Sequence, residues 1–161
     1  SGADDKIRYA YSGELDIMGK YVPGYEPENK LYLGGEGMIA TADGYTDFIR
    51  MLLNHGELNG YRFLNESTVK EMYLPHTQLE NEYGYNGYNL WVTSELVKEK
   101  GEGDEGLWRG GGYEGTHFWI DPKRDFVGVI MSQMFETPKS GEGRDGKIVG
   151  EIYRQIFSNE K

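Results

Sequence analysis

The segment that most constrains the fold of this chain covers residues 107–122 and reads LWRGGGYEGTHFWIDP. Four glycines lie between positions 110 and 115, and aromatic and β-branched residues follow them directly, up to an Asp-Pro pair. Glycine loses more conformational freedom on folding than any other residue, so such a run is expected where the backbone turns tightly or where another group approaches it closely. A second apolar stretch follows a short polar turn, and together they predict two strands, at roughly 113–121 and 125–133.

A nucleotide-binding loop is one interpretation of these glycines. Gly110-x-Gly112-x-x-Gly115 matches the spacing of dinucleotide-binding and kinase loops, but the same spacing recurs at 101–106 and 141–146. Three matches among 24 glycines show that the spacing alone specifies little. A dinucleotide site also needs a strand before the glycines, a helix directly after them and a further parallel strand, and no match has that order. The sequence therefore predicts no nucleotide and no other cofactor.

The rest of the chain alternates helix and strand patterns. Apolar residues recur at helical spacing from about 42 to 55, where Thr41 is a candidate N-cap and Gly56 stands at a C-cap position. The Asn-Gly pair at 59–60 is typical of a tight hairpin turn. The remaining expected elements are a short helix at 65–73, a strand at 83–93, a charged loop at 98–106 and a C-terminal helix with one apolar stripe at 148–157. This order predicts an α+β fold with antiparallel strands.

Composition narrows the classes of partner. The chain has 161 residues, and its 27 acidic and 17 basic side chains give a net charge of −10, which disfavours binding to the phosphate backbone of nucleic acids. It contains no cysteine, which excludes disulfides and thiolate chemistry. No apolar run approaches the roughly 20 residues of a membrane span. A periplasmic or secreted bacterial protein fits this composition, and a cytoplasmic location stays open.

Two further patterns bear on catalysis. The three histidines, at 55, 76 and 117, are too far apart in the sequence to form a metal-binding motif, so no metal site is predicted. His117 follows the glycines closely, but packing within a strand is the favoured interpretation. Ser67-Thr-Val-Lys70 fits the Ser-x-x-Lys pattern, in which a lysine activates a serine nucleophile. Its place in the first turn of a short surface helix favours a capping role instead.

Two blocks of the sequence together resemble one family. Residues 33–73, LGGEGMIATADGYTDFIRMLLNHGELNGYRFLNESTVKEMY, are similar to the segment of serine β-lactamase-type hydrolases in which a glycine-rich turn leads into a helix and a Gly-Glu-Leu motif. Residues 109–133, RGGGYEGTHFWIDPKRDFVGVIMSQ, resemble the family's Lys-Thr-Gly or His-Gly-Gly triplet and the strand that follows it. The resemblance covers roughly residues 5–158 and is closest to class C β-lactamase-like esterases and penicillin-binding-protein-like hydrolases. It implies part of a β-lactamase/transpeptidase-like fold, an antiparallel sheet with the C-terminal helix packed on it.

The resemblance also implies what the chain lacks. In that family a nucleophilic Ser-x-x-Lys and a Tyr-x-Asn motif precede the segments matched here, and no Tyr-x-Asn triplet occurs in residues 1–161. Residues 1–161 are therefore expected to form a single partial domain, the C-terminal part of a larger serine hydrolase, and to be inactive alone.

The family's triplet falls on Gly110, Gly111 and Gly112. In the family the next residue, here Tyr113, donates its backbone N–H to the oxyanion formed during acyl transfer. Gly110 departs from the family, where Lys, His or Trp at this position helps to bind a substrate carboxylate or to position the base. Arg109 would substitute for that side chain if the loop were shifted by one residue. These positions are the predicted substrate-binding and oxyanion site.

The resemblance implies hydrolysis of an ester, amide, β-lactam or peptide through an acyl-enzyme, with this chain forming one wall of the active site. Two alternatives stay open. One is a non-catalytic binding or scaffolding relative of the same fold, which the departure at Gly110 favours. The other is a carbohydrate-binding module that uses exposed Tyr and Trp rings. Without the family's N-terminal strands, the 125–133 strand would be a bare sheet edge, which predicts a homodimer through that edge or dependence on the missing segment.

Overall fold

The computed structural model describes residues 40–76, 82–112, 115–132 and 144–157. Its helices are α1 (Ala42–Leu53), α2 (Glu66–Tyr73), α3 (Glu95–Glu99) and α4 (Arg144–Ile156). Its strands are β1 (Glu57–Leu58), β2 (Tyr61–Arg62), β3 (Gly84–Asn86), β4 (Trp91–Thr93), β5 (Trp108–Gly111), β6 (His117–Asp121) and β7 (Phe126–Ile130).

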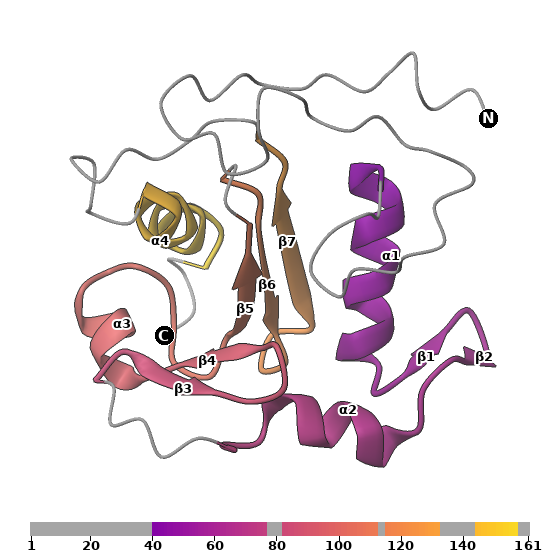
Figure 1. The fold of residues 1–161 in the computed structure, drawn as a ribbon. Coiled ribbons are helices and arrows are strands. Elements are labelled where there is room, and N and C mark those ends of the chain that lie inside the picture. Colours follow the sequence, from indigo (N-terminus) through magenta and orange to yellow (C-terminus); the bar gives the residue numbers. More distant parts are fainter. Residues whose placement is uncertain (1–39, 77–81, 113–114, 133–143, 158–161) are drawn as a thin grey trace, which may run out of the picture.

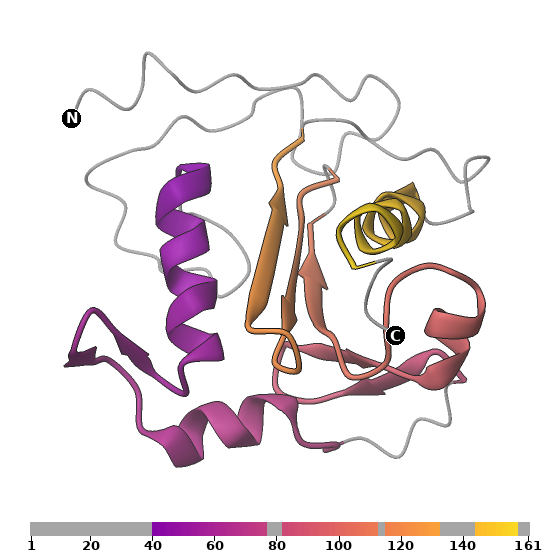
Figure 2. The same cartoon turned by 180° about the vertical axis from the view of Figure 1, so that it is seen from behind.

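Most of these strands form one antiparallel sheet. The strand order is β3-β4-β5-β6-β7, and β1 and β2 form a separate hairpin that turns at Asn59-Gly60, as predicted. Helix α1 lies on one side of the sheet and α4 on the other (Figures 1 and 2). The predicted α+β class is confirmed, with its antiparallel sheet, its packed C-terminal helix and its helix near 42–55.

Each face of the sheet has its own core, because successive residues of a strand point to opposite faces. In β6, Phe118 and Ile120 belong to the core on the α1 side, and Trp119 belongs to the core on the α4 side. The buried members on the α1 side are Ile49, Met51, Leu52, Val69, Leu90, Val92, Trp108, Phe118 and Ile120. Those on the α4 side are Leu107, Trp119, Val149 and Tyr153. All of β6 is buried, so this strand separates the two cores.

The ends of α1 follow from the local sequence. The Thr41 hydroxyl accepts a hydrogen bond from the first turn at 3.1 Å, which confirms the predicted N-cap. At the other end, the Gly56 N–H donates to the Met51 carbonyl at 2.8 Å and the His55 N–H donates to the Leu52 carbonyl at 3.0 Å. These two bonds form a Schellman motif, with left-handed φ angles of 53° at His55 and 96° at Gly56. Gly56 therefore helps to end the helix, although the C-cap residue itself lies two positions earlier.

The prediction of a single strand at 83–93 is wrong. This segment is a hairpin, in which β3 pairs antiparallel with β4 in the register Gly84↔Thr93. The chain reverses between the two strands, where Asn89 has a left-handed φ of 63°. Asparagine tolerates this conformation better than most residues, so the polar residues between the aromatic ones form a turn and do not continue the strand.

Two other boundaries differ from the sequence-based expectation. The predicted loop at 98–106 begins inside a helix, because α3 continues to Glu99. Strand β5 was not predicted, because its glycines give no alternating pattern. The strands predicted at 113–121 and 125–133 are present in shorter form as β6 and β7. Among the described helices, none is both long and apolar enough to cross a bilayer.

Candidate functional site

The glycine end of β5 extends beyond the neighbouring strand. On one side, β5 pairs with β6 along its whole length, from Trp108↔Ile120 to Gly111↔His117. On the other side, its pairing with β4 stops at Arg109. No described strand therefore covers Gly111 on the β4 side. We call this stretch the open edge of β5, and it comprises residues 110 and 111.

The peptide groups of the open edge alternate in direction. The Gly112 N–H donates to the Thr116 carbonyl on the β6 side at 2.7 Å. Because hydrogen-bonding groups of successive residues in an antiparallel strand point to alternate sides, the N–H and C=O of Gly111 point toward the β4 side. Gly111 and Gly112 are both exposed. An extended chain or acyl group could therefore lie against the open edge and form backbone hydrogen bonds with Gly111.

A phenyl ring occupies the space beside Gly110. A Cβ atom at this position would lie 2.4 Å from Cε1 and 2.6 Å from Cζ of Phe118, which is far closer than van der Waals contact. Phe118 pairs with Gly110 across the sheet and is buried. Its ring meets Tyr45 of α1 edge to face, with 5.5 Å between ring centroids. The ring of Phe118 thus takes the place of any side chain at residue 110.

Arg109 lies on the other face of the sheet. Its Nε donates a hydrogen bond to Nε2 of His117 at 3.2 Å. This bond requires an unprotonated Nε2, so the proton of a neutral His117 resides on Nδ1. The register Gly110↔Phe118 places Arg109 opposite Trp119, whose side chain belongs to the α4-side core. A role of Arg109 in substrate binding stays a prediction, and its side chain lies on the face opposite to the one that a residue-110 side chain would occupy.

Comparison with known sequences identifies the family. Residues 2–150 match the family described as Beta-lactamase.

The chain belongs to the Beta-lactamase family.

This match confirms the resemblance that was inferred from residues 33–73 and from residues 109–133, which contain the glycine triplet. It relates the chain, at the level of the family, to hydrolases. Similar proteins include Protein Rv1367c of Mycobacterium tuberculosis (strain ATCC 25618 / H37Rv) and Uncharacterized protein MT1414 of Mycobacterium tuberculosis (strain CDC 1551 / Oshkosh). Each is 29% identical over 143 residues, which is 80% of this chain and 33% of the relative. The chain thus spans about a third of the length of these curated relatives.

The other candidate residues in this Beta-lactamase-family sequence lie on different elements of the structure. Ser67 and Lys70 are both exposed on α2, which agrees with the interpretation of a surface helix. His55 follows the C-cap of α1, His76 follows α2 and His117 lies in β6, and no group of three or more potential metal ligands occurs among the described residues. Tyr113 lies outside the described residues, so its role as oxyanion donor stays a prediction.

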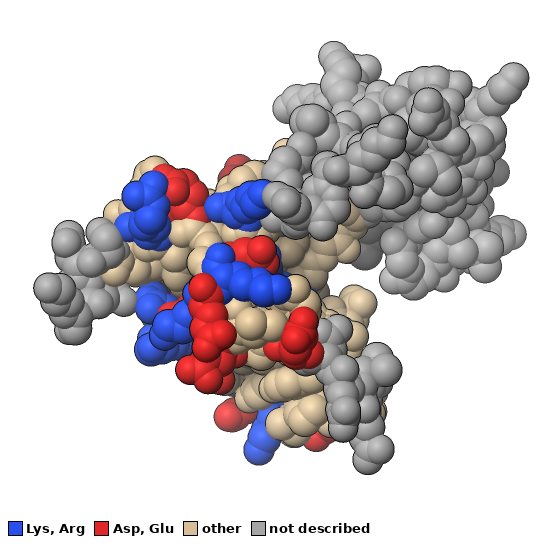
Figure 3. Space-filling model, turned by 90° about the vertical axis from the view of Figure 1, so that its left-hand side faces the viewer, with Lys and Arg blue, Asp and Glu red and all other residues tan. Residues whose placement is uncertain are grey.

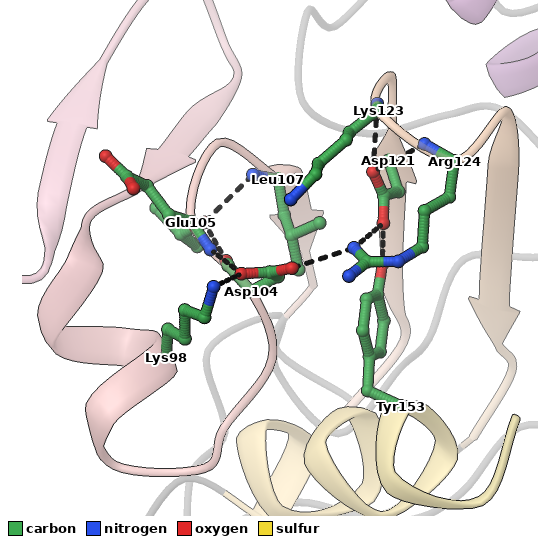
Figure 4. Close-up of polar contacts among 9 residues, drawn as sticks. Lys98, Asp104, Glu105, Leu107, Asp121, Lys123, Arg124 and Tyr153 are labelled. Atoms are coloured by element: carbon green, nitrogen blue, oxygen red, sulfur yellow. Dashed lines mark hydrogen bonds and ion pairs between the residues drawn. The ribbon is translucent and has the colours of Figure 1, made fainter. Parts of the chain in front are cut away.

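Sequence analysis missed a cluster of buried charges around Asp121 (Figure 4). The Asp121 carboxylate is 1% exposed and accepts backbone N–H bonds from Lys123 and Arg124 at 3.0 and 3.1 Å. It also accepts from the Arg124 guanidinium at 3.0 Å and from the Tyr153 hydroxyl at 2.8 Å. The only signal in the sequence is the Asp-Pro turn itself, whose first side chain is of the kind that bonds to backbone two residues on.

Asp104 extends this cluster toward α3. Its carboxylate lies 2.8 Å from the Arg124 guanidinium and 3.1 Å from the Lys98 ammonium group. Arg124 therefore joins two carboxylates, one from the loop after α3 and one from the end of β6 (Figure 4). Because β6 begins beside Gly111 and ends at Asp121, the cluster and the open edge lie at opposite ends of that strand. The cluster links the loop after α3 to the end of β6 and is remote from the candidate site.

The pKa shifts in the cluster agree with this structural role. Burial tends to raise the pKa of Asp104, but hydrogen bonds from Arg124 and Lys98 outweigh burial and leave the pKa below its ordinary value. Burial, reinforced by the hydrogen bond to Asp121, raises the pKa of the Tyr153 hydroxyl. At neutral pH these shifts favour a charged Asp104 carboxylate and a neutral Tyr153 hydroxyl.

The face that carries α3 and α4 has acidic and basic side chains interspersed (Figure 3). Several of them pair with each other, including Lys98 with Asp104 and Arg154 with Glu151. Although the net charge of the chain is −10, this face does not form one continuous acidic surface.

Proposed function

We propose that this chain is the C-terminal part of a β-lactamase-related serine hydrolase and forms one wall of its active site. The observation that supports this proposal best is the open edge of β5, which leaves the N–H and C=O of Gly111 uncovered by any described strand. The edge comprises two glycines, 110 and 111, of the triplet that resembles the family's active-site motif. The substrate would be a small ester, amide or peptide.

The reaction in this proposal is acyl transfer. A serine outside the chain attacks the substrate carbonyl carbon, and its proton passes to a neighbouring lysine. The carbonyl oxygen becomes an oxyanion, which the Tyr113 N–H stabilises, while the acyl group lies along the open edge. The tetrahedral intermediate collapses and expels an alcohol or amine, which takes up the proton, and water then releases the acid. In well-studied hydrolases, one such oxyanion donor lowers the activation barrier by about 3 kcal/mol.

The chain alone is proposed to be inactive. Ser67 and Lys70 are exposed on α2, where water is not excluded from a reacting serine. The nucleophile therefore comes from a segment outside the chain. The match to only 33% of the curated relatives supports such a longer parent protein.

Kinetics of the full-length protein test the role of the open edge. Gly111→Pro removes the N–H that faces the substrate, and it is expected to lower kcat/KM for p-nitrophenyl butyrate at least roughly tenfold. Gly111→Ala keeps this N–H and is expected to lose clearly less. Equal kcat/KM values for the two variants, with equal free energies of unfolding, would argue against backbone pairing at Gly111.

A non-catalytic relative of the same fold is the second candidate. It is favoured by the absence of a side chain at Gly110 and by the Phe118 ring in that space. A full-length protein that has the upstream serine and lysine, folds normally and hydrolyses no simple ester would establish this candidate.

The edge of the sheet at β7 leads to a proposal about assembly. Within the described residues, β7 pairs only with β6, so no described strand covers its other side. We propose that the chain, when produced alone, forms a homodimer through this edge, because uncovered edges template further pairing. Light scattering of the chain should give twice the monomer mass, whereas a strictly monomeric chain would contradict the proposal.

A further inference from the structure

The α1-side wall of the open edge is aromatic. Gly110 has no side chain of its own, and the Phe118 ring lies where one would begin, 2.4 Å from an ideal Cβ. Tyr45 packs edge to face on Phe118, and Phe48 lies one helical turn further along α1 with 5.8 Å between its ring centroid and that of Tyr45. Phe48 remains 43% exposed, so the aromatic cluster reaches the surface.

None of the described side chains that form this wall, those of Phe118, Tyr45 and Phe48, is cationic. Arg109 adjoins the glycine triplet, but it lies on the opposite face of the sheet and donates to His117. The first turn of α1 does not replace the missing cation, because Thr41 caps it and Asp43 adds a negative charge there. Burial raises the pKa of the Tyr45 hydroxyl, so this group is also neutral at physiological pH.

We infer that the site takes acyl groups that are uncharged and apolar, such as those of neutral esters, and discriminates against acyl groups that bear a carboxylate. This inference rests on the proposed function and specifies its substrate class. A carboxylate that lies against the aromatic wall loses hydration and gains no cationic partner from the described side chains of that wall, which is unfavourable. An apolar acyl chain gains by burial against the same rings.

The test uses two p-nitrophenyl esters of equal acyl length, the butyrate and the monoester of succinate, with the full-length protein. We expect kcat/KM to be at least about tenfold higher for the butyrate, since an unpaired charge is disfavoured at an apolar wall. Comparable values, or a preference for the succinate monoester, would overturn the inference and leave the proposed function intact. Hydrolysis of neither ester would overturn the proposed function and the inference with it.

Variants locate the discrimination at residue 110. Gly110→Lys combined with Phe118→Ala supplies a cation and the space for its side chain, and it is expected to lower the butyrate preference at least about fivefold through charge pairing. Phe118→Ala alone enlarges the site without adding charge and should keep the preference for butyrate. If the folded double variant keeps the wild-type preference, the aromatic wall is not the specificity element. If the double variant does not fold, the ratio measured for the wild-type protein decides the inference.

Discussion

At Gly128 in β7, the indole ring of Trp119 crosses the neighbouring strand. A Cβ atom at residue 128 would lie 2.1 Å from Cζ2 and 2.3 Å from Cη2 of that ring. Trp119 is 2% exposed, so its ring has little room to move aside. Gly128→Ala is therefore expected to lower the free energy of unfolding by roughly 1–3 kcal/mol through overpacking, measured by urea denaturation.

Gly112→Ala is the matched control for this prediction. The nearest described atom to a Cβ at residue 112 is Cβ of Thr116, at 3.9 Å, which is ordinary contact. The substitution should change the free energy of unfolding by less than about 0.5 kcal/mol. Equal losses for the two alanine variants would contradict the packing described around Trp119.

A second prediction at the residue scale concerns the buried charge of Asp121. Asp121→Asn removes the carboxylate charge that balances Arg124. The same carboxylate accepts the hydrogen bond from the Tyr153 hydroxyl. Arg124 keeps the Asp104 carboxylate as a partner, but it and the Tyr153 hydroxyl lose a charged acceptor, so a loss of roughly 2 kcal/mol in the free energy of unfolding is expected from denaturation curves. Glu57→Gln disrupts the ion pair with Arg62, in which both side chains are nearly half exposed, and should cost less than about 1 kcal/mol. A cost at Asp121 as small as that at Glu57 would show that the cluster does not stabilise the fold.

At the scale of elements, the Thr41 cap determines how well α1 begins. Thr41→Ala removes the hydroxyl that accepts a hydrogen bond from a backbone N–H in the first turn of the helix. This change should lower the free energy of unfolding by about 1 kcal/mol. Thr46→Ala is the matched control, because its hydroxyl donates within the helix to the Ala42 carbonyl and alanine is a better helix former. A thermal or urea melt in which the Thr46 variant loses more stability than the Thr41 variant would refute this assignment.

The link between the α3 loop and the β6–β7 turn should depend on pH. The pKa of Asp104 in the folded chain lies below its ordinary value of 3.8, so the unfolded chain binds a proton more readily. The stabilisation by this carboxylate is therefore present at neutral pH and is lost as the pH falls below about 4, through the folded-state pKa. Asp104→Asn should cost most stability near neutral pH and progressively less in acid. Urea denaturation across that range measures the difference, and a cost that grows in acid would reverse the sign.

The helices could be predicted from the sequence better than the strands. Apolar spacing and a capping threonine suffice for α1, since a helix is built from contacts within a few residues. Strand β5 could not be recognised, because its site-forming residues are glycines without side-chain alternation. The β3–β4 hairpin was missed for a related reason: the reversal at Asn89 depends on a left-handed backbone that asparagine permits but does not require.

At the scale of the whole molecule, the candidate site results from a register between distant segments. The glycine triplet and its departure at Gly110 are visible in the sequence. The Phe118 ring beside Gly110 is not, because it depends on the pairing of β5 with β6 and on the packing of α1 against their shared face. The open edge likewise depends on where β4 ends. Such features follow from tertiary pairing, so local sequence patterns cannot specify them.

Active-site labelling with a fluorophosphonate, followed by peptide mapping, tests the central claim most directly. The probe is applied to the full-length protein and to the 161-residue chain in parallel. We predict labelling of a serine outside the chain in the full-length protein and no labelling of the chain alone. Labelling of Ser67, or of any other serine within the chain, would contradict the assignment of this chain as one wall of a serine-hydrolase site.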